Sequence, residues 1–422
     1  MEDVLEKDYP IWFREDDSKT LGELIHKRQS AVIVGMKRVG ISNFLRFFLN
    51  HPQVSQKYLD TNKHLFIPVD LNDLVEIELY PFWVLTLKRT LDAAERINLD
   101  SKVVKTLESL FLDAIQSKDI FLLIDTLRKS LNKIIDAGYL PSIFFIRFDR
   151  IKDALNPGFF SNILGLRDGT NNKLALIFTS FRTLDHLAPK IFDKQSLSVF
   201  FKSIYLKPAK KDDSRVIYKT YATNYGLDLT PALELELFKN VDGYIHYLHL
   251  AMILLSEKIK GNLSEILIKD ERVNLQSEEL WESLEILEQQ VLLQIVEGEK
   301  IFKDKAAAKY LWDTGMVTED DKIFSPLFEN YIHSKTKKEV AANNTDFSKK
   351  ENLLFKFLNN NLNVICERES IIEAVWSEEE SFGVSDWAID RLVARVRVKL
   401  KKQESGLEIV TIKTRGYKLV NG

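Results

Sequence analysis

The feature that most constrains the fold is a charge-polarised helix near the C-terminus, expected over residues 385–401. Its apolar side chains recur every three or four residues and so form one stripe, made of Ile389, Leu392, Val393, Val396 and Leu400. The opposite face carries Trp387, Arg391, Arg395 and Lys402. From Arg391 to Lys418 there are nine Lys or Arg against two acids. One side of this helix must therefore be buried, while the other presents positive charge.

The surrounding residues predict two more helices and a hairpin. Ser348 and Glu351 have the spacing of a capping box at the start of a first helix, and a second helix is expected over residues 368–376. Two β-rich runs within residues 408–419, with Gly416 near the turn, indicate a basic hairpin. Three helices followed by a hairpin make a winged helix-turn-helix, whose third helix has the size of a DNA major groove.

These residues resemble the OmpR/PhoB-type winged-helix DNA-binding domain of bacterial response regulators. The resemblance covers residues 347–422 and is carried by residues 348–354, 366–376, 384–400 and 411–417. It places Thr414 where the family usually has a glycine of the wing turn, and it leaves little room in residues 336–346 for the strands that normally precede the first helix.

The resemblance implies a role for each polar side chain of the third helix and the hairpin. Arg395 would reach base edges, Arg391 and Arg397 would lie near the backbone, and Lys413 would enter the minor groove. Hydroxyl groups of the hairpin would contact phosphates. The expected DNA-binding residues are Trp387, Arg391, Arg395, Arg397, Thr411, Lys413, Arg415 and Tyr417. The implied partner is double-stranded DNA, and because one winged helix covers little DNA, we expect a homodimer or oligomer.

A second informative stretch lies between a predicted strand, residues 31–34, and a predicted helix, residues 43–49. It has the glycine and serine spacing of a phosphate-binding loop, in which backbone N–H groups converge on phosphates and a Ser holds Mg²⁺. Ile41 stands at the position of the usual lysine. The candidate nucleotide-binding residues here are Gly35, Lys37, Arg38, Gly40 and Ser42. Lys37 and Arg38 are candidates to replace the missing charge.

Two further predicted core strands add polar residues at their carboxyl ends. Residues 141–149 form a strand ending in Asp149, the candidate metal-side carboxylate, and residues 173–180 are followed by Arg182. Residues 66–71 make another strand. Because ligands bind at the carboxyl edge of open parallel sheets, Asp149 and Arg182 join the candidate nucleotide site.

Residues 10–335 resemble a STAND-type, AAA-related P-loop NTPase, through residues 12–15, the loop, the strands ending at Asp149 and Arg182, and Gly243-Tyr244-Ile245. The resemblance implies ATP or ADP with Mg²⁺ as candidate ligands. The family usually has proline where this chain has Ile245. With Ile41 in the lysine position, we expect no efficient hydrolysis. A P-loop fold kept as a scaffold without nucleotide is the alternative.

A chain of 422 residues is too long for one core and predicts several domains. The expected fold class is an α/β P-loop NTPase-like core with a helical lid, followed by an all-α winged helix and a C-terminal winged helix-turn-helix of the α+β class. The expected domains are the NTPase-like core 1–207, the lid 208–275, an internal winged helix 276–335, a linker 336–346 and the DNA-binding domain 347–422. Within the internal winged helix, helices are expected over residues 278–297 and 305–314.

Composition excludes several other classes. The net charge of −3 gives no global attraction to nucleic acid, so binding requires a local basic patch. The single cysteine, Cys366, expected in a turn, fits a reducing cytoplasm. No signal peptide or membrane span is evident. His246 and His249 are three residues apart without a further ligand nearby, so packing is preferred over metal binding.

The sequence thus predicts a cytoplasmic, sequence-specific transcriptional regulator that is not an enzyme, with a nucleotide-sensing or scaffold module. Two alternatives stay open. One is an active ATPase docked on DNA or protein through its winged helix. The other is a protein–protein adaptor whose winged helix binds no DNA.

Overall fold

The computed structural model describes residues 4–189, 191, 201–257, 261–298, 307–339, 347–376, 384–402, 406–413 and 415–421. The chain divides into two compact units, Met1–Val216 and Ile217–Gly422. Each unit is built around its own core and is described separately.

The first unit contains a five-stranded parallel sheet. Its strands are β1 (Ser30–Val34), β2 (His64–Asp70), β3 (Leu140–Ile146), β4 (Ala175–Ser180) and β5 (Phe201–Tyr205), in the order β2-β3-β4-β1-β5. Every residue of β1 and β4 is buried, as expected for central strands covered on both faces. The predicted strands are confirmed as β1, β2, β3 and β4, although β3 ends at Ile146, before the predicted end at Asp149, and β5 was not predicted.

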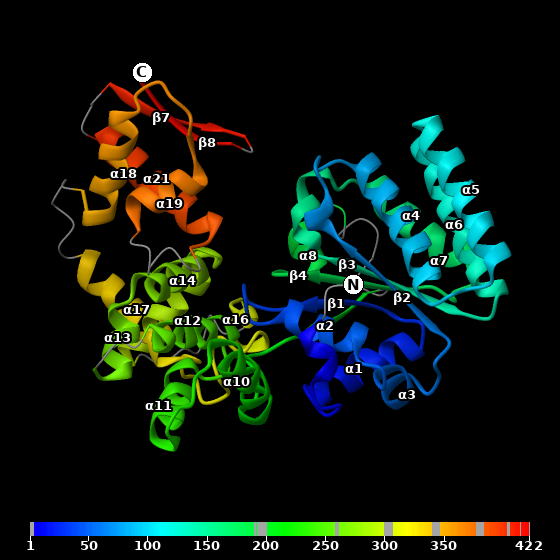
Figure 1. Cartoon of the computed structure of the whole chain (residues 1–422), viewed down its shortest axis with the longest axis horizontal. Helices are drawn as coiled ribbons and strands as arrows, with labels where there is room; N and C mark the ends of the chain where they lie inside the picture. Colours follow the sequence, from blue (N-terminus) through cyan, green and yellow to red (C-terminus); the bar gives the residue numbers. More distant parts are fainter. Residues whose placement is uncertain are drawn as a thin grey trace. The chain divides into compact units, whose positions relative to one another are not determined.

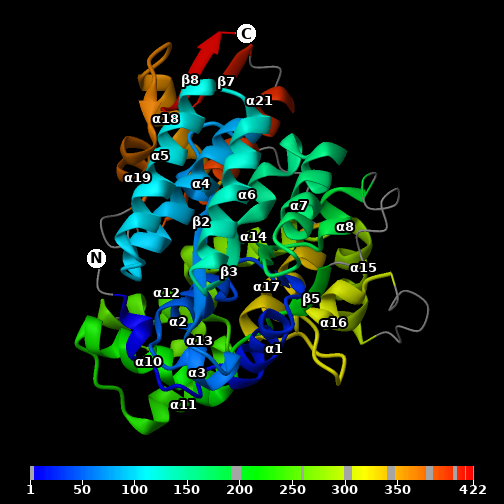
Figure 2. The same cartoon turned by 90° about the vertical axis from the view of Figure 1, so that its right-hand side faces the viewer.

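Helices cover both faces of this sheet (Figure 1). One layer contains α1 (Glu15–His26), α2 (Ile41–Asn50) and α3 (Val54–Leu59). The other contains α4 (Leu79–Arg96), α5 (Ser101–Ser117), α6 (Ile120–Asp136) and α7 (Pro157–Gly169), with the short α8 (Leu184–Leu187) following β4. Figure 2 shows α4, α5 and α6 lying side by side, which agrees with their mutual contacts.

Aromatic side chains fill the space between the sheet and both helix layers. Successive strand residues point to opposite faces, so Phe144 and Phe145 of β3 enter different halves of the core. The Phe144 ring lies 6.4 Å from that of Phe48 in α2, whereas the Phe145 ring lies 5.0 Å from that of Phe82 in α4. Both residues are fully buried. This double-sided core fixes the carboxyl edge of the sheet, where the candidate loop lies.

The second unit begins with a helical region. Its helices are α10 (Lys211–Tyr225), which contains the boundary between the units, α11 (Pro231–Val241), α12 (Ile245–Ser256), α13 (Leu263–Lys269), α14 (Glu271–Glu282), α15 (Ile286–Glu297), α16 (Lys309–Asp313) and α17 (Pro326–Glu339). An isolated antiparallel bridge joins Val317 to Ile323, after α16.

Two helix predictions in this region need correction. The helix expected over residues 278–297 is two helices, α14 and α15, because Glu285 starts α15 with a capping box to Glu288. The helix expected over 305–314 is helical only in α16, Lys309–Asp313, and residues 305 and 306 lie outside the described residues. The first of these two helices, α14, begins at Glu271, earlier than the predicted start at residue 278.

The C-terminal domain has three helices and a small antiparallel sheet. They are α18 (Lys349–Asn360), β6 (Cys366–Glu367), α19 (Arg368–Val375), α21 (Asp386–Lys402), β7 (Leu407–Ile412) and β8 (Gly416–Asn421), with strand order β6-β8-β7. The predicted winged helix-turn-helix is confirmed. Cys366 lies in a short strand paired with Tyr417 rather than in a turn.

Local sequence signals explain how this domain is closed. The predicted capping box is present, since the Ser348 N–H donates to Glu351 Oε2 (2.8 Å) and the Glu351 N–H donates to Ser348 Oγ (3.4 Å). Gly416 has φ +143°, and a Cβ there would lie 2.0 Å from the Cys366 carbonyl oxygen. Only glycine therefore permits β8 to approach β6 this closely. Thr414 and residues 340–346 of the expected linker lie outside the described residues.

Candidate nucleic-acid interface and phosphate-binding loop

The loop Gly35–Ser42 lies at the carboxyl edge of the first unit's sheet, between β1 and α2. Because β1 and the adjacent β4 are parallel, the chain leaves both at the carboxyl edge, but the connection from β1 runs to β2 at one side of the sheet and the connection from β4 runs to β5 at the opposite side. Neighbouring strands whose connections diverge in this way open a crevice in which parallel α/β proteins bind ligands. The sequence-predicted loop is therefore at the expected place in the fold.

The loop closes tightly around Gly35. A Cβ at this position would lie 2.9 Å from Val39 Cγ1, 3.0 Å from the Leu206 carbonyl oxygen and 3.3 Å from Ile41 Cδ1. The side chain of Ile41 thus reaches back over the loop, in the place of a lysine. Gly40, with φ +112°, forms the N-cap of α2 and permits the turn into the helix.

Lys37 and Asp149 lie near each other at this edge. The Lys37 ammonium lies 5.8 Å from the centroid of the Phe181 ring, which follows β4. Burial raises the pKa of Asp149, and the positive charge of Lys37 opposes part of that rise. Asp149 Oδ1 is buried and has no hydrogen-bond partner among the described residues. An unpaired buried carboxylate oxygen is the type of atom that accepts a hydrogen bond from a ligand or from metal-bound water.

The prediction that β3 ends in Asp149 is wrong in detail. The strand ends at Ile146, Arg147 adopts a left-handed conformation with φ +60°, and Asp149 lies in a 3₁₀-helix, Phe148–Ala154. The left-handed turn carries the chain off the sheet before the acid is reached. Arg182, two residues after β4, is half-buried, and its N–H donates to Ser180 Oγ (3.2 Å).

A cavity of about 430 Å³ opens beside Ser42 and the ends of β2 and β3. Two of its four arginines form ion pairs with acids that line the same cavity. Arg147 pairs with Asp70, and Arg89 pairs with Asp73 and Asp92 at 2.8 Å each. Arg147 and Arg89 are thus already paired and supply little charge for a phosphate. Of the other two arginines that line the cavity, Arg46 pairs with Glu6 and Arg96 donates a hydrogen bond to the Phe66 carbonyl (3.0 Å).

The residues present fit part of a nucleotide site. The glycine-rich turn and the N-terminus of α2 supply backbone N–H groups for phosphates, Ser42 supplies a hydroxyl, and Asp149 supplies a carboxylate. Ile41 fits poorly, because an apolar side chain replaces the charge that steadies the terminal phosphate. The arrangement can cradle an anion but lacks a main electrostatic contribution to phosphoryl transfer.

The third helix of the C-terminal domain, α21, is held by its apolar stripe. The predicted stripe residues are all buried in one core with α18, α19 and the hairpin. Arg391 and Arg395 lie on a different face, and their side chains are 32% and 28% exposed. The predicted separation of apolar and basic faces on this helix is confirmed.

The basic face of α21 packs against α14 of the same unit. Arg391 Nε lies 3.7 Å from Glu278 Oε1, and the Arg391 guanidinium also pairs with Glu282. Arg395 pairs with Glu278 and, at 3.2 Å, with Glu351 of α18. A small pocket next to these pairs is lined by residues of α14 and by Trp387. Three of the eight expected DNA-binding side chains therefore face α14.

Three other expected DNA-binding residues, Arg397, Thr411 and Tyr417, form hydrogen bonds within the domain. The Arg397 guanidinium donates to the Ile409 carbonyl and to Thr411 Oγ1, both at 2.8 Å. Tyr417 is buried, its hydroxyl donates to Asp390, and it accepts a hydrogen bond from Arg368 (3.2 Å). Burial raises the pKa of Tyr417 to about 12. Lys413 and Arg415, at the tip of the hairpin, are exposed.

Sequence reasoning missed the acidic partners of α21. Glu278 and Glu282 are four residues apart, and so are Arg391 and Arg395. One helical turn on α14 thus matches one helical turn on α21. That matched spacing was present in the sequence, but nothing in the sequence indicated that these two helices meet.

Comparisons with known proteins agree with the C-terminal assignment. Residues 342–419 match the family model described as "Transcriptional regulatory protein, C terminal". No curated protein matches the chain. The chain therefore carries a winged-helix domain of the transcriptional-regulator type.

Among solved structures, the chain is similar to a Walker-type ATPase of Pyrococcus abyssi, with 18% identity, 76% of this chain and 96% of that one covered, and a TM-score of 0.47. It is also similar to the ORC2 protein of Aeropyrum pernix in its ADP form, with 14% identity, 80% and 90% coverage, and a TM-score of 0.40. A third similar structure is the ORC1 protein of Aeropyrum pernix in complex with DNA, with 11% identity, 100% of this chain and 93% of that one covered, and a TM-score of 0.36. The α/β class of the first unit is established by its own strand order.

The described residues contain neither a membrane-spanning helix nor a cluster of metal ligands. None of their helices is long and apolar enough to cross a membrane. No cluster of three or more potential metal ligands occurs among them. His246 lies near His249, whose Nε2 is 2.9 Å from the Tyr225 hydroxyl, in an aromatic cluster.

Proposed function

We propose that this chain is a sequence-specific DNA-binding transcriptional regulator. The observation that carries the proposal is α21, which has a buried apolar stripe on one side and Arg391 and Arg395 on another, in a segment matching the transcriptional-regulator family. A helix of this kind reads base edges in the major groove, where arginine recognises guanine with two hydrogen bonds.

The hairpin provides the second contact to DNA. Lys413 and Arg415 are exposed at its tip, where they can reach phosphates or the minor groove of the same duplex. Thr411 and Arg397, hydrogen-bonded to each other, would position the hairpin against α21. Because Tyr417 is buried, its role would be to hold the wing on the domain through Asp390 and Arg368, and its hydroxyl would not contact phosphate.

The first unit would sense nucleotide without efficient hydrolysis. ATP or ADP with Mg²⁺ would be held by the backbone of Gly35–Gly40, by Ser42 and by Asp149, with Lys37, Arg38 and Arg182 nearby. The bound Mg²⁺ would neutralise phosphate charge, while Ile41 supplies none. A scaffold role without nucleotide remains the alternative for this unit.

The proposed domain divisions are those expected from the sequence: core 1–207, lid 208–275, internal winged helix 276–335, linker 336–346 and DNA-binding domain 347–422. The boundary between lid and internal winged helix lies within α14, and the boundary before the linker lies within α17. One winged helix covers few base pairs, so two copies on adjacent half-sites would give a regulator enough affinity and specificity. Such a protein acts in the compartment that holds the DNA, the cytoplasm of a bacterial cell.

The test is binding of the purified full chain to random-sequence duplex DNA at low and moderate salt. We expect affinity to fall steeply with salt, because phosphate contacts release counterions. The triple variant Arg391→Ala, Arg395→Ala, Lys413→Ala should lose retention on DNA. If the triple variant and the unaltered chain behave alike, the adaptor function is supported instead. ATP turnover above that of buffer would favour the ATPase alternative.

A further inference from the structure

The basic side chains of α21 that are proposed to read bases lie against carboxylates of α14 and α18. Glu278, Glu282 and Glu351 supply the carboxylates, of which the first two come from α14 and the third from α18. The side chains of Glu278 and Glu351 are only 10% and 5% exposed. Buried carboxylates are stable only when cations neutralise them, so these glutamates require partners such as Arg391 and Arg395.

Apolar packing joins the same two helices. Leu275 of α14 is buried in the core cluster of the C-terminal domain, together with residues of α18, α19 and α21. Arg395 donates a hydrogen bond to Glu278 and pairs with Glu351, and Arg391 pairs with Glu278 and Glu282. While these pairs hold, neither guanidinium is available to make the two parallel hydrogen bonds by which arginine recognises a base or a phosphate. Contact with α14 and contact with DNA are therefore alternatives for α21.

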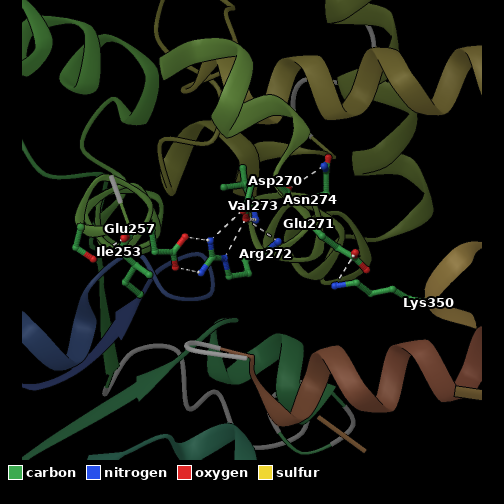
Figure 3. A network of polar contacts seen from close by, with 9 residues as sticks. Ile253, Glu257, Asp270, Glu271, Arg272, Val273, Asn274 and Lys350 are labelled. Atoms are coloured by element: carbon green, nitrogen blue, oxygen red, sulfur yellow. Dashed lines mark hydrogen bonds and ion pairs between the residues drawn. The ribbon is translucent and has the colours of Figure 1, made fainter. Parts of the chain in front are cut away.

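Helix α14 itself is firmly anchored (Figure 3). The Arg272 guanidinium donates hydrogen bonds to the carboxylate of Glu257, at 2.8 and 3.1 Å, and to that of Asp270, at 3.0 Å. Lys350 of α18 forms an ion pair with Glu271 at 2.9 Å. Although burial lowers the pKa of Arg272, the carboxylates of Glu257 and Asp270 raise it above its usual value, so this cation stays charged. The acidic face is thus presented by a fixed helix.

We propose that the acidic face of α14 is an intramolecular docking surface that competes with DNA for the reading helix α21. The proposal rests on the proposed DNA-binding function and adds its regulation. The contact lies wholly within residues 217–422, so releasing α21 requires rearrangement inside the second unit. While α21 is docked on α14, its arginines are paired with glutamates and cannot read DNA.

The experiment compares two full-length variants with the unaltered chain by duplex-DNA binding. Glu278→Gln with Glu282→Gln removes the docking charges while keeping side-chain shape. Glu319→Gln with Glu329→Gln is the matched control, because it removes two exposed charges of the same unit that lie outside α14 and α21. We expect the docking variant to bind between about 5- and 150-fold more tightly, the usual range of coupling between sites, and the control to change little.

Hydrogen exchange gives a second readout that does not depend on DNA. The docking variant should show faster amide exchange in residues 386–402, while the control variant and the unaltered chain should not differ. Leu275→Ser should likewise tighten DNA binding and speed amide exchange in residues 386–402, because it removes the apolar contact between α14 and the C-terminal domain. Equal gains in DNA affinity for the docking and control variants would overturn the proposal, since net charge alone would explain them.

Failure of this proposal can be separated from failure of the proposed function. Unchanged exchange together with unchanged DNA affinity in the docking variant would overturn the docking surface, while salt-sensitive DNA binding would still support a regulator. Faster exchange with no DNA binding by any form would leave α21 released but unable to read DNA. That result would overturn both the competition and the DNA-binding function.

Discussion

The loop at Gly35–Ser42 and the basic face of α21 are the two candidate sites for phosphate-bearing ligands among the described residues, and they differ in their positive charge. In the loop, an expected lysine is replaced by Ile41, whose side chain lies over Gly35. On α21, the expected arginines are present but are paired with Glu278 and Glu282. A missing charge cannot be recovered by a conformational change, whereas a paired charge can be released. Hydrolysis should therefore be permanently weak, and DNA binding should be adjustable.

The largest effect should come from removing the charges of α21. Arg391→Ala with Arg395→Ala should weaken duplex-DNA binding roughly 30-fold, because two base or phosphate contacts worth about 1–3 kcal/mol each are lost, less the energy of the broken docking. Fluorescence anisotropy would measure it. Lys356→Ala, which removes an exposed cation of α18, is the control and should change affinity little. A comparable loss in the control would mean that α21 has no special role.

The second effect concerns the charge missing from the loop. Ile41→Lys should tighten ATP binding by about tenfold, as expected for one charge-assisted contact to phosphate. Isothermal titration calorimetry with ATP and Mg²⁺ would measure the change, and Ile41→Met would control for side-chain length. No difference between the lysine and methionine variants would indicate that phosphates do not bind in this loop.

The sequence was sufficient for the parts of this fold that follow a local rule. The stripe on α21, the capping box at Ser348 and the loop between β1 and α2 each depend on residues near one another in the chain, and all three were correctly placed. Strand β5 carries a mixed pattern in which Lys202 and Ser203 are exposed, so periodicity did not reveal it. Asp149 was displaced by a left-handed turn at Arg147, a conformation that side-chain type rarely predicts.

The candidate site was predictable in composition but not in accessibility. Each arginine of α21 was identified, yet the partner carboxylates on α14, Glu278 and Glu282, lie more than a hundred residues earlier in the chain. Tyr417 illustrates the same limit, because its hydroxyl serves Asp390 and Arg368 inside the domain. Tertiary contacts between distant segments decide such cases, and a single sequence carries no direct record of them.

A smaller effect should follow from Tyr417→Phe. The substitution removes the hydroxyl that links Asp390 to Arg368, although these two residues also pair directly at 2.6 Å. We expect a loss of about 1 kcal/mol in the free energy of unfolding, the usual net value of one hydrogen bond. Urea denaturation would measure it. DNA affinity should stay unchanged, and a selective loss of affinity at constant stability would instead support a phosphate contact.

The smallest effect concerns pH and Glu351. Burial raises the pKa of this carboxyl, but the hydrogen bonds from Lys399 and the Ser348 N–H, with the charge of Arg395, outweigh it and leave the pKa below its usual value. The stability from ionised Glu351 is therefore complete above the unfolded pKa of about 4.3 and is lost as pH falls through the lower folded pKa.

Glu351→Gln tests this directly, since glutamine keeps the capping box but carries no charge. The unaltered chain should exceed the variant in free energy of unfolding by a constant amount above about pH 5, and the difference should shrink below about pH 4. Denaturation curves across this range would show it. A difference that grows on acidification would contradict the assigned direction of the pKa shift.

The most direct measurement of the account is a titration of labelled duplex DNA with the unaltered full chain at low and moderate salt, with and without ATP and Mg²⁺. We expect binding that weakens steeply as salt rises, with a shift in affinity on adding nucleotide if the first unit senses it. Binding indifferent to nucleotide would make that unit a scaffold and leave the DNA-reading domain intact. No salt-sensitive binding by this chain or by the Glu278→Gln, Glu282→Gln variant would contradict the central claim that α21 reads DNA.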